Sequence, residues 1–247
     1  MRFSIQNNCS KLVPRRVTSR PVQSGLPRAT RSRFRHPLTE PMPDTTRTFI
    51  ALAVPETLTL RLTRLQQQLA GELTGVRWSM TAPFHVTLAF LGDVAHSDLV
   101  EVCRAVEEAV AGFAPFSLKL DGIGAFPDPT RPRVIWAGIS GPGVETLKEL
   151  QGTIANAVAR VNYATDSKPF HPHVTLGRAE SGRGRGRQKG EEPTSDMSRL
   201  VSHYRTWHAG PFPVNQVITF ASASTREGPS YTPLGRGALK AKKAVVE

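Results

Sequence analysis

The sequence has few cysteines and no long hydrophobic run. Its 247 residues include two cysteines, Cys9 and Cys103, and no Cys-x-x-Cys motif. Two isolated thiols can build neither a disulfide framework nor a structural zinc site. The clean apolar stretches, such as FIALAV, are strand-length and fall short of the ~18 to 20 residues that cross a bilayer. These absences predict an intracellular, cytoplasmic protein with no membrane contact, and we expect a monomer.

Acidic residues are also scarce relative to basic ones. The chain has 20 Asp and Glu against 32 Lys and Arg, a net charge of +12. Residues 1–46 hold nine basic and two acidic residues, whereas the remainder holds 23 basic and 18 acidic ones. A moderately basic body suits an anionic partner such as nucleic acid, although the same charge also serves solubility alone. The charge therefore favours nucleic acid only mildly.

The first 46 residues lack a periodic apolar face and contain six prolines. They cannot bury enough surface to offset the entropy of ordering, so we expect a disordered basic leader. The Arg- and Ser-rich composition also matches an organelle transit peptide, while the lack of an apolar core segment argues against a secretory signal. A third interpretation places the true start at Met42. That start or a plain disordered tail is preferred, because a strand opens soon after Met42.

From Arg47 the order of expected elements occurs twice. Apolar patterning predicts strands at 48–54, 75–78, 85–92 and 116–126 with helices at 56–70 and 97–112 between them. The second half repeats this order with strands at 133–140, 170–178 and 212–225, helices at 142–161 and 195–204, and a last segment at 231–234. Such a duplication predicts two packed α+β lobes, related by a pseudo-two-fold axis, with a cleft between them.

Two segments stand apart from the repeat. In the loop at 180–195, Arg183, Arg185, Arg187 and Lys189 are interleaved with Gly and neighbouring polar residues. A flexible cationic loop of this kind could clamp an RNA backbone, and the plainer interpretation is a solvated insertion. The chain ends in a basic tail at 235–247.

The tetrapeptide HVTL occurs twice, at His85–Leu88 and at His173–Leu176. Residues i and i+2 of a strand share a face, so each motif presents an imidazole beside a threonine hydroxyl, while Val and Leu point into the core. One such histidine alone is most often a half-buried side chain without a function. Its duplication at matched positions, 88 residues apart, instead indicates two His-Thr pairs that converge on one site.

Two imidazoles and two hydroxyls around one small volume suit a phosphate. One histidine can take a proton from a nucleophile while the other gives a proton to the leaving oxygen. The hydroxyls of Thr87 and Thr175 and the guanidinium of Arg178 can donate hydrogen bonds to the non-bridging oxygens. This chemistry requires no metal and no cofactor.

The other reactive or aromatic side chains have plainer interpretations. His171 shares the strand face of His173 but has no carboxylate partner, so we expect no metal site there. Cys103 lies in an apolar helical pattern and is expected to pack in the core. Surface or helix positions are expected for His96, His203 and His208, and packing is more common than base stacking for Phe84, Trp78 and Phe126.

These motifs resemble the two-histidine (2H) phosphoesterase superfamily, and within it the LigT-like RNA 2′,3′-cyclic phosphodiesterases, also called 2′-5′ RNA ligases. The resemblance runs through RTFIALAVP, GVRW, FHVTLAFLGDV, GIGAFPDPTRPRVIWAGI, FHPHVTLGR and ITFASAS, over most of residues 47–234. It implies a bilobal α+β fold with two antiparallel sheets, flanked by helices, that line a central cleft. It covers neither the leader, the Arg/Gly-rich loop nor the basic tail.

The resemblance also implies an activity on RNA ends or nucleotides that carry a 2′,3′-cyclic phosphate. The reaction would be hydrolysis to a 2′-phosphomonoester, with metal-free 2′-5′ RNA joining as its reverse. His85 would be the proton donor and His173 the proton acceptor, while Thr87, Thr175 and Arg178 would hold the phosphate. Two alternatives stay open: a non-catalytic module that binds RNA ends, and a 2H enzyme that acts on another small cyclic phosphate or on tRNA-splicing products.

Overall fold

The computed structural model of the chain describes residues 44–79, 83–165, 169–179, 196–226 and 228–240. All of them belong to one unit of the chain, Pro41–Glu247. The loop at 180–195 and most of the expected leader and tail lie outside the described residues. Within the described ranges, no helix is long and apolar enough to cross a membrane.

The first repeat folds in the order that its apolar pattern predicts. Its elements are β1 (Thr45–Ala53), α1 (Glu56–Glu72), the short β2 (Val76–Trp78), β3 (His85–Ala95), α2 (Leu99–Val110) and β4 (Phe116–Phe126). Strand β1 ends two residues before Pro55, which has no N–H with which to continue a ladder. The buried leucines of α1 are three or four residues apart, at 58, 62, 65 and 69, so they line one face of the helix.

The second repeat contains one more strand than its sequence pattern predicts. Its elements are β5 (Val134–Ser140), α3 (Val144–Arg160), β6 (His173–Ala179), α4 (Ser198–His203), the short 3₁₀ helix η1 (Tyr204–Thr206), β7 (His208–Val214), β8 (Gln216–Thr225) and β9 (Gly228–Ala238). The expectation of one long strand over 212–225 is wrong, because the chain changes partner at Asn215: β7 pairs with β4 and β8 pairs with β1. Pro211 and Pro213 fit β7 because it is an edge strand.

The strands form an antiparallel arrangement that shows the duplication directly. Their order is β7-β4-β5-β6-β3-β1-β8-β9, with β2 attached to β6. The first strand of each repeat, β1 or β5, pairs with a strand of the other repeat, β8 or β4. The two four-stranded halves meet at a single pair, Val86 opposite Val174. We call β3-β1-β8-β9 the His85 half and β6-β5-β4-β7 the His173 half. The two expected sheets are thus two halves joined at one residue pair.

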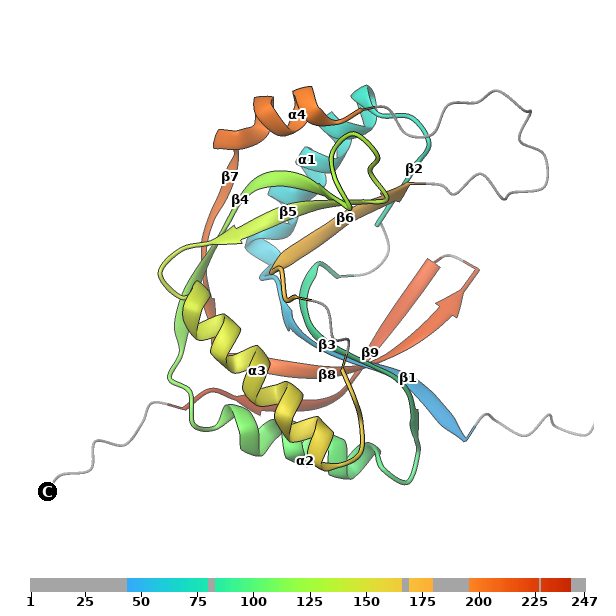
Figure 1. The fold of residues 1–247 in the computed structure, drawn as a ribbon, viewed down its shortest axis with the longest axis vertical. Coiled ribbons are helices and arrows are strands. Elements are labelled where there is room, and N and C mark those ends of the chain that lie inside the picture. The colour runs from blue at the N-terminus through green and yellow to red at the C-terminus, as the bar shows by residue number, and fades with distance from the viewer. Residues whose placement is uncertain (1–43, 80–82, 166–168, 180–195, 227, 241–247) are drawn as a thin grey trace, which may run out of the picture. The chain divides into compact units, whose positions relative to one another are not determined.

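The helices cover one face of these strands. Helices α2 and α3 pack against each other; α2 contacts β8 and β9, and α3 contacts β3, while α1 contacts β6 and β7 and α4 contacts β4 (Figure 1). On this helix face Val86, Leu88, Val174 and Leu176 are all buried in the main hydrophobic core. A second, small cluster of Phe49, Ala51, Ile218 and Phe220 is separate from that core. The alternate residues of β3 and β6 define the opposite face, which we call the motif face.

Strand β9 continues to Ala238, four residues past Leu234, where the domain was expected to end. A Cβ atom placed on Gly235 would lie 2.9 Å from the Sγ of Cys103, so the strand packs closely against α2 there. Burial raises the pKa of the Cys103 thiol. Cys103 therefore packs against β9 as a half-buried side chain and not in the core as expected, with its thiol held in the protonated form.

Candidate active site

The two His-Thr pairs lie on neighbouring strands of the sheet. His85 and Thr87 alternate with buried residues on β3, and His173 and Thr175 do so on β6. Because β3 and β6 are antiparallel around the Val86–Val174 pair, His85 and Thr175 lie on one side of that pair and Thr87 and His173 lie on the other. The fold therefore brings together four side chains that the duplication predicts to converge.

Both imidazoles are held by the same backbone contact. The Nδ1 of His85 is 2.9 Å from the carbonyl oxygen of Pro83, and the Nδ1 of His173 is 2.6 Å from the carbonyl oxygen of His171. A carbonyl oxygen only accepts hydrogen bonds, so each Nδ1 carries the proton and donates it. In the neutral ring the lone pair then lies on Nε2. Each motif thus presents Nε2 as its titrating atom.

The pKa values of both imidazoles are lowered. For His85 the main cause is burial, the hydrogen bond to Pro83 opposes it, and the charges of His173 and Arg178 add to the lowering. For His173 burial again dominates, the bond to His171 opposes it, and the charges of Arg178 and His171 add to it. Each imidazole is therefore predominantly neutral at pH 7, and protonation of one disfavours protonation of the other.

Arg178 reaches the motif face because β6 contains a bulge. Thr175 lies opposite Trp136, and the next residue of β5, Ile135, lies opposite Gly177. Leu176 is therefore an extra residue in β6, and beyond it the side chains that point to each face of the sheet shift by one position. The shift brings the exposed Arg178 to the same side as His173. Its charge acts on both histidines, and it also opposes the rise that burial causes in the pKa of Tyr231.

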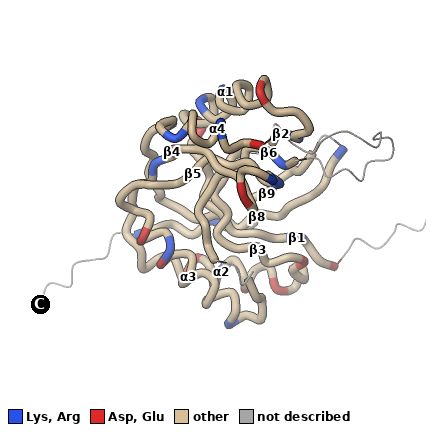
Figure 2. The backbone as a smooth tube through the Cα atoms, turned by 45° about the horizontal axis from the view of Figure 1, so that its top comes forward, with Lys and Arg blue, Asp and Glu red and all other residues tan. Residues whose placement is uncertain are grey.

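A second arginine stands beside the first. Arg77 of β2 lies directly opposite Arg178 in the strand register, and both are exposed. Like charges at such a pair are unfavourable without an anion between them. Elsewhere in the described chain, basic and acidic positions are mixed over helices and strands (Figure 2). The Arg77–Arg178 pair is thus a cationic edge suited to a phosphate.

Aromatic rings surround both histidines. The ring centroid of His85 is 5.1 Å from Phe49 and 5.2 Å from Tyr231, and that of His173 is 5.0 Å from Phe126 and 6.2 Å from Trp136. Sequence reasoning considered Phe126 but missed the other three. Phe49 and Trp136 lie in the apolar strands β1 and β5, so their sequence pattern predicts ordinary core residues. Nothing in the sequence links Tyr231 to His85.

The remaining candidates lie away from this group or pack elsewhere. Phe84 is buried in the main core, and Trp78 is half-buried against it. His96 pairs with the Thr46 hydroxyl, and its Nε2 is 2.8 Å from that oxygen. His203 and His208 are exposed at the end of α4 and the start of β7. Among the residues that the structure describes, no three His, Cys, Asp or Glu side chains gather where they could hold a metal.

Comparison with known proteins places this arrangement in a family. A model of the family described as "LigT like Phosphoesterase" matches residues 52–136, which include the first motif. An RNA 2′,3′-cyclic phosphodiesterase of Aquifex aeolicus is 31% identical over 75% of this chain and 93% of its own length. A protein of the same name from Aeropyrum pernix is 30% identical over 70% and 92%.

Solved structures agree with the sequence comparison. The crystal structure of E. coli LigT in its apo form matches with a TM-score of 0.61 and 25% identity, covering 80% of this chain and 99% of LigT. Similarity in sequence extends over nearly the whole of the relatives, and similarity in fold extends over nearly the whole of LigT. The chain therefore belongs to the LigT-like phosphoesterase family.

Proposed function

We propose that this protein hydrolyses the 2′,3′-cyclic phosphate of RNA ends to a 2′-phosphomonoester. The observation that carries the proposal is the pair of imidazoles on β3 and β6, each with Nδ1 bonded to a backbone carbonyl and Nε2 left to titrate. Support comes from the relatives in Aquifex aeolicus and Aeropyrum pernix, which carry the name of this activity.

In the proposed reaction the two imidazoles have opposite tasks. The neutral His173 takes a proton from water at Nε2 while the water oxygen bonds to phosphorus. The protonated His85 gives its Nε2 proton to the 3′ oxygen as the bond from phosphorus to that oxygen breaks. The products are a 3′-hydroxyl and a 2′-phosphomonoester, and the enzyme finishes with the two histidines in exchanged protonation states.

Negative charge builds up on the non-bridging phosphate oxygens during the reaction, and hydrogen-bond donors are needed to stabilise it. The hydroxyls of Thr87 and Thr175, two residues after each histidine on the same face, donate to the non-bridging oxygens. Arg178 adds a fixed positive charge on the same side.

A bound substrate also resolves the problem that both imidazoles are mainly neutral in the free protein. The burial and positive charges that lower the pKa of His85 are countered when a phosphate anion lies against it. Substrate binding thus promotes the protonated His85 that the reaction needs. We propose that a 5′-hydroxyl of a second RNA can replace water, which forms a 2′-5′ bond by the same proton transfers.

The test is an assay on an oligonucleotide that ends in a 2′,3′-cyclic phosphate, with EDTA present throughout. We expect turnover to a 2′-phosphate, identified by its resistance to a 3′-specific phosphatase. A 3′-phosphate product would show that the leaving oxygen is wrongly assigned. Binding of the oligonucleotide without turnover would support the non-catalytic alternative instead.

A further inference from the structure

A second polar group lies on the motif face, two strands away from His173. In the strand register His173 of β6 is opposite Gly138 of β5, and Gly138 is opposite Asp121 of β4. Residues opposite each other in a sheet have side chains on the same face, and strands are about 4.8 Å apart, so the Cα atoms of His173 and Asp121 are separated by about 10 Å. Asp121 is thus a neighbour of the candidate active site across the sheet.

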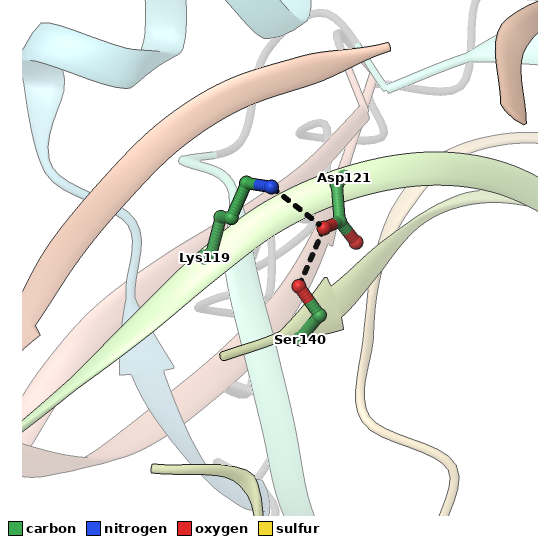
Figure 3. Close-up of polar contacts among 3 residues, drawn as sticks. All are labelled: Lys119, Asp121 and Ser140. Atoms are coloured by element: carbon green, nitrogen blue, oxygen red, sulfur yellow. Dashed lines mark hydrogen bonds and ion pairs between the residues drawn. The ribbon is translucent and has the colours of Figure 1, made fainter. Parts of the chain in front are cut away.

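Asp121 belongs to a group of three side chains that the structure holds together (Figure 3). Its Oδ2 accepts a hydrogen bond of 2.5 Å from the Ser140 hydroxyl and lies 3.2 Å from the Lys119 ammonium. Lys119 and Ser140 are themselves opposite in the register of β4 and β5. The Lys119 and Asp121 side chains are 43% and 31% exposed, so both can meet a ligand. We call Lys119, Asp121 and Ser140 the β4–β5 trio.

The residue of β5 that lies between His173 and Asp121 is Gly138, which has no side chain. A Cβ atom on Gly138 would lie 2.5 Å from the backbone oxygen of Asp121, so a larger residue does not fit there without movement. The neighbouring Trp136 leans over Gly124, since a Cβ on Gly124 would lie 2.2 Å from the indole ring. The surface from His173 to Asp121 is therefore bare backbone with an aromatic ring along its side.

We propose that the β4–β5 trio binds the first nucleotide of the RNA strand whose 5′-hydroxyl is the nucleophile in 2′-5′ joining. This inference rests on the proposed function and concerns a second substrate of the same site. Lys119 has two N–H donors beyond the one aimed at Asp121, and these suit a phosphate. The second oxygen of Asp121 can accept a hydrogen bond from a ribose 2′-hydroxyl. A cation and a carboxylate held side by side match the ribose-phosphate backbone.

The position of the trio favours binding of the RNA strand with the 5′-hydroxyl over binding of the RNA that ends in the cyclic phosphate. His173 removes the proton of the nucleophile, so the ribose that carries the nucleophile lies on the His173 half. The half-buried ring of Tyr231 lies beside His85, which donates to the 3′ oxygen of the other nucleotide. That ring suits the base of the nucleotide with the cyclic phosphate, while the polar trio suits the backbone of the incoming strand. In hydrolysis the nucleophile is water, which has no ribose or phosphate for the trio to bind. The trio should therefore not affect the rate of hydrolysis.

The test compares joining with hydrolysis in the full-length protein. Joining is measured with one oligoribonucleotide that ends in a 2′,3′-cyclic phosphate and another that begins with a 5′-hydroxyl, and hydrolysis with a mononucleoside 2′,3′-cyclic phosphate. Lys119→Gln and Asp121→Asn should each slow joining at least tenfold and leave hydrolysis within twofold. Lys148→Gln is the matched control: it removes another exposed lysine, 2.8 Å from Glu145 on α3, and should change neither rate.

A modified acceptor strand gives a second readout. Removal of the 2′-hydroxyl from its first nucleotide should slow joining by the unmutated protein, and it should have no further effect on Asp121→Asn. Equal losses of joining and hydrolysis in the trio variants would overturn the inference in favour of a structural role. Unchanged joining, or hydrolysis by the unmutated protein without any joining, would also overturn it while the proposed hydrolysis stands. Absence of hydrolysis in the unmutated protein would instead refute the proposed function.

Discussion

At the scale of single residues, the two histidines are related by more than their tetrapeptides. Each Nδ1 donates to the carbonyl two residues before it, and each ring lies near an aromatic side chain about 5 Å away, Phe49 for His85 and Phe126 for His173. Their strands differ, because Arg178 of β6 has no charged counterpart at the matching position of β3, where Phe90 stands. Similar rings can therefore take different roles.

Removal of either imidazole tests the acid–base roles. We expect His85→Ala and His173→Ala each to lower kcat by about 10²-fold or more, with the double variant little worse than the poorer single one, because the two act as one unit. With a nitrophenyl phosphodiester, whose leaving group needs no acid, His85→Ala should recover part of its activity and His173→Ala should not. Recovery of His173→Ala alone would mean that the two roles are exchanged.

Arg178 sets the charge of the site. Because its positive charge lowers the pKa of both histidines, Arg178→Ala should raise both pKa values and move the pH profile of kcat/KM toward higher pH. The same variant should lose about 10²-fold in kcat/KM through the missing phosphate contact. NMR titration of the histidine ring protons measures the first effect without substrate. Unchanged titration midpoints would show that Arg178 points away from the site.

At the scale of elements, the bulge of β6 decides where Arg178 points. Gly177 sits in this bulge under β2: a Cβ there would lie 2.8 Å from the Cγ1 of Val76 and 2.9 Å from the Trp78 ring. A side chain at this position has to displace β2, and with it Arg77, from its pairing with β6. The strand irregularity and the short strand beside it thus form one unit that shapes the cationic edge.

Gly177→Val should therefore destabilise the protein by about 1–3 kcal/mol through overpacking. Thermal unfolding measures this loss, and a fall in kcat/KM should accompany it because Arg178 is displaced. Gly152→Ala in α3 is the control: no atom lies within 4 Å of a Cβ placed there, and alanine should stabilise the helix by about 0.5–1 kcal/mol. Equal stability of the Gly177 variant would contradict the close packing of β2 on β6.

At the scale of the whole molecule, charge outside the described residues bears on RNA binding. Residues 1–41 contain nine Lys and Arg and one acidic residue. Their removal should leave turnover of a mononucleoside 2′,3′-cyclic phosphate unchanged, because the residues of the site, from Phe49 onward, all follow the removed segment. Binding of a longer RNA should weaken at low salt, with a shallower dependence of affinity on salt concentration. Loss of mononucleotide turnover would place part of the leader in the active site.

Much of this protein is readable from its sequence because the relevant signals are local. The period of two in a strand is a steric property of the backbone, so HVTL already aligns His with Thr on one face and Val with Leu on the other. Two copies in one element order predict the duplication, and Leu58, Leu62 and Leu65 predict α1 through their spacing. These features need no knowledge of distant partners.

Tertiary structure alone decided the rest, because lateral pairing depends on register and on how the core packs. The single Val86–Val174 pair brings His85 and His173 together across 88 residues, and the partner change at Asn215 divides one expected strand between the two halves. A bulge at Leu176 and Gly177, whose position depends on the register with β5, turns Arg178 toward the histidines. The register of three strands places the β4–β5 trio beside His173, although its members are ordinary polar residues in the sequence.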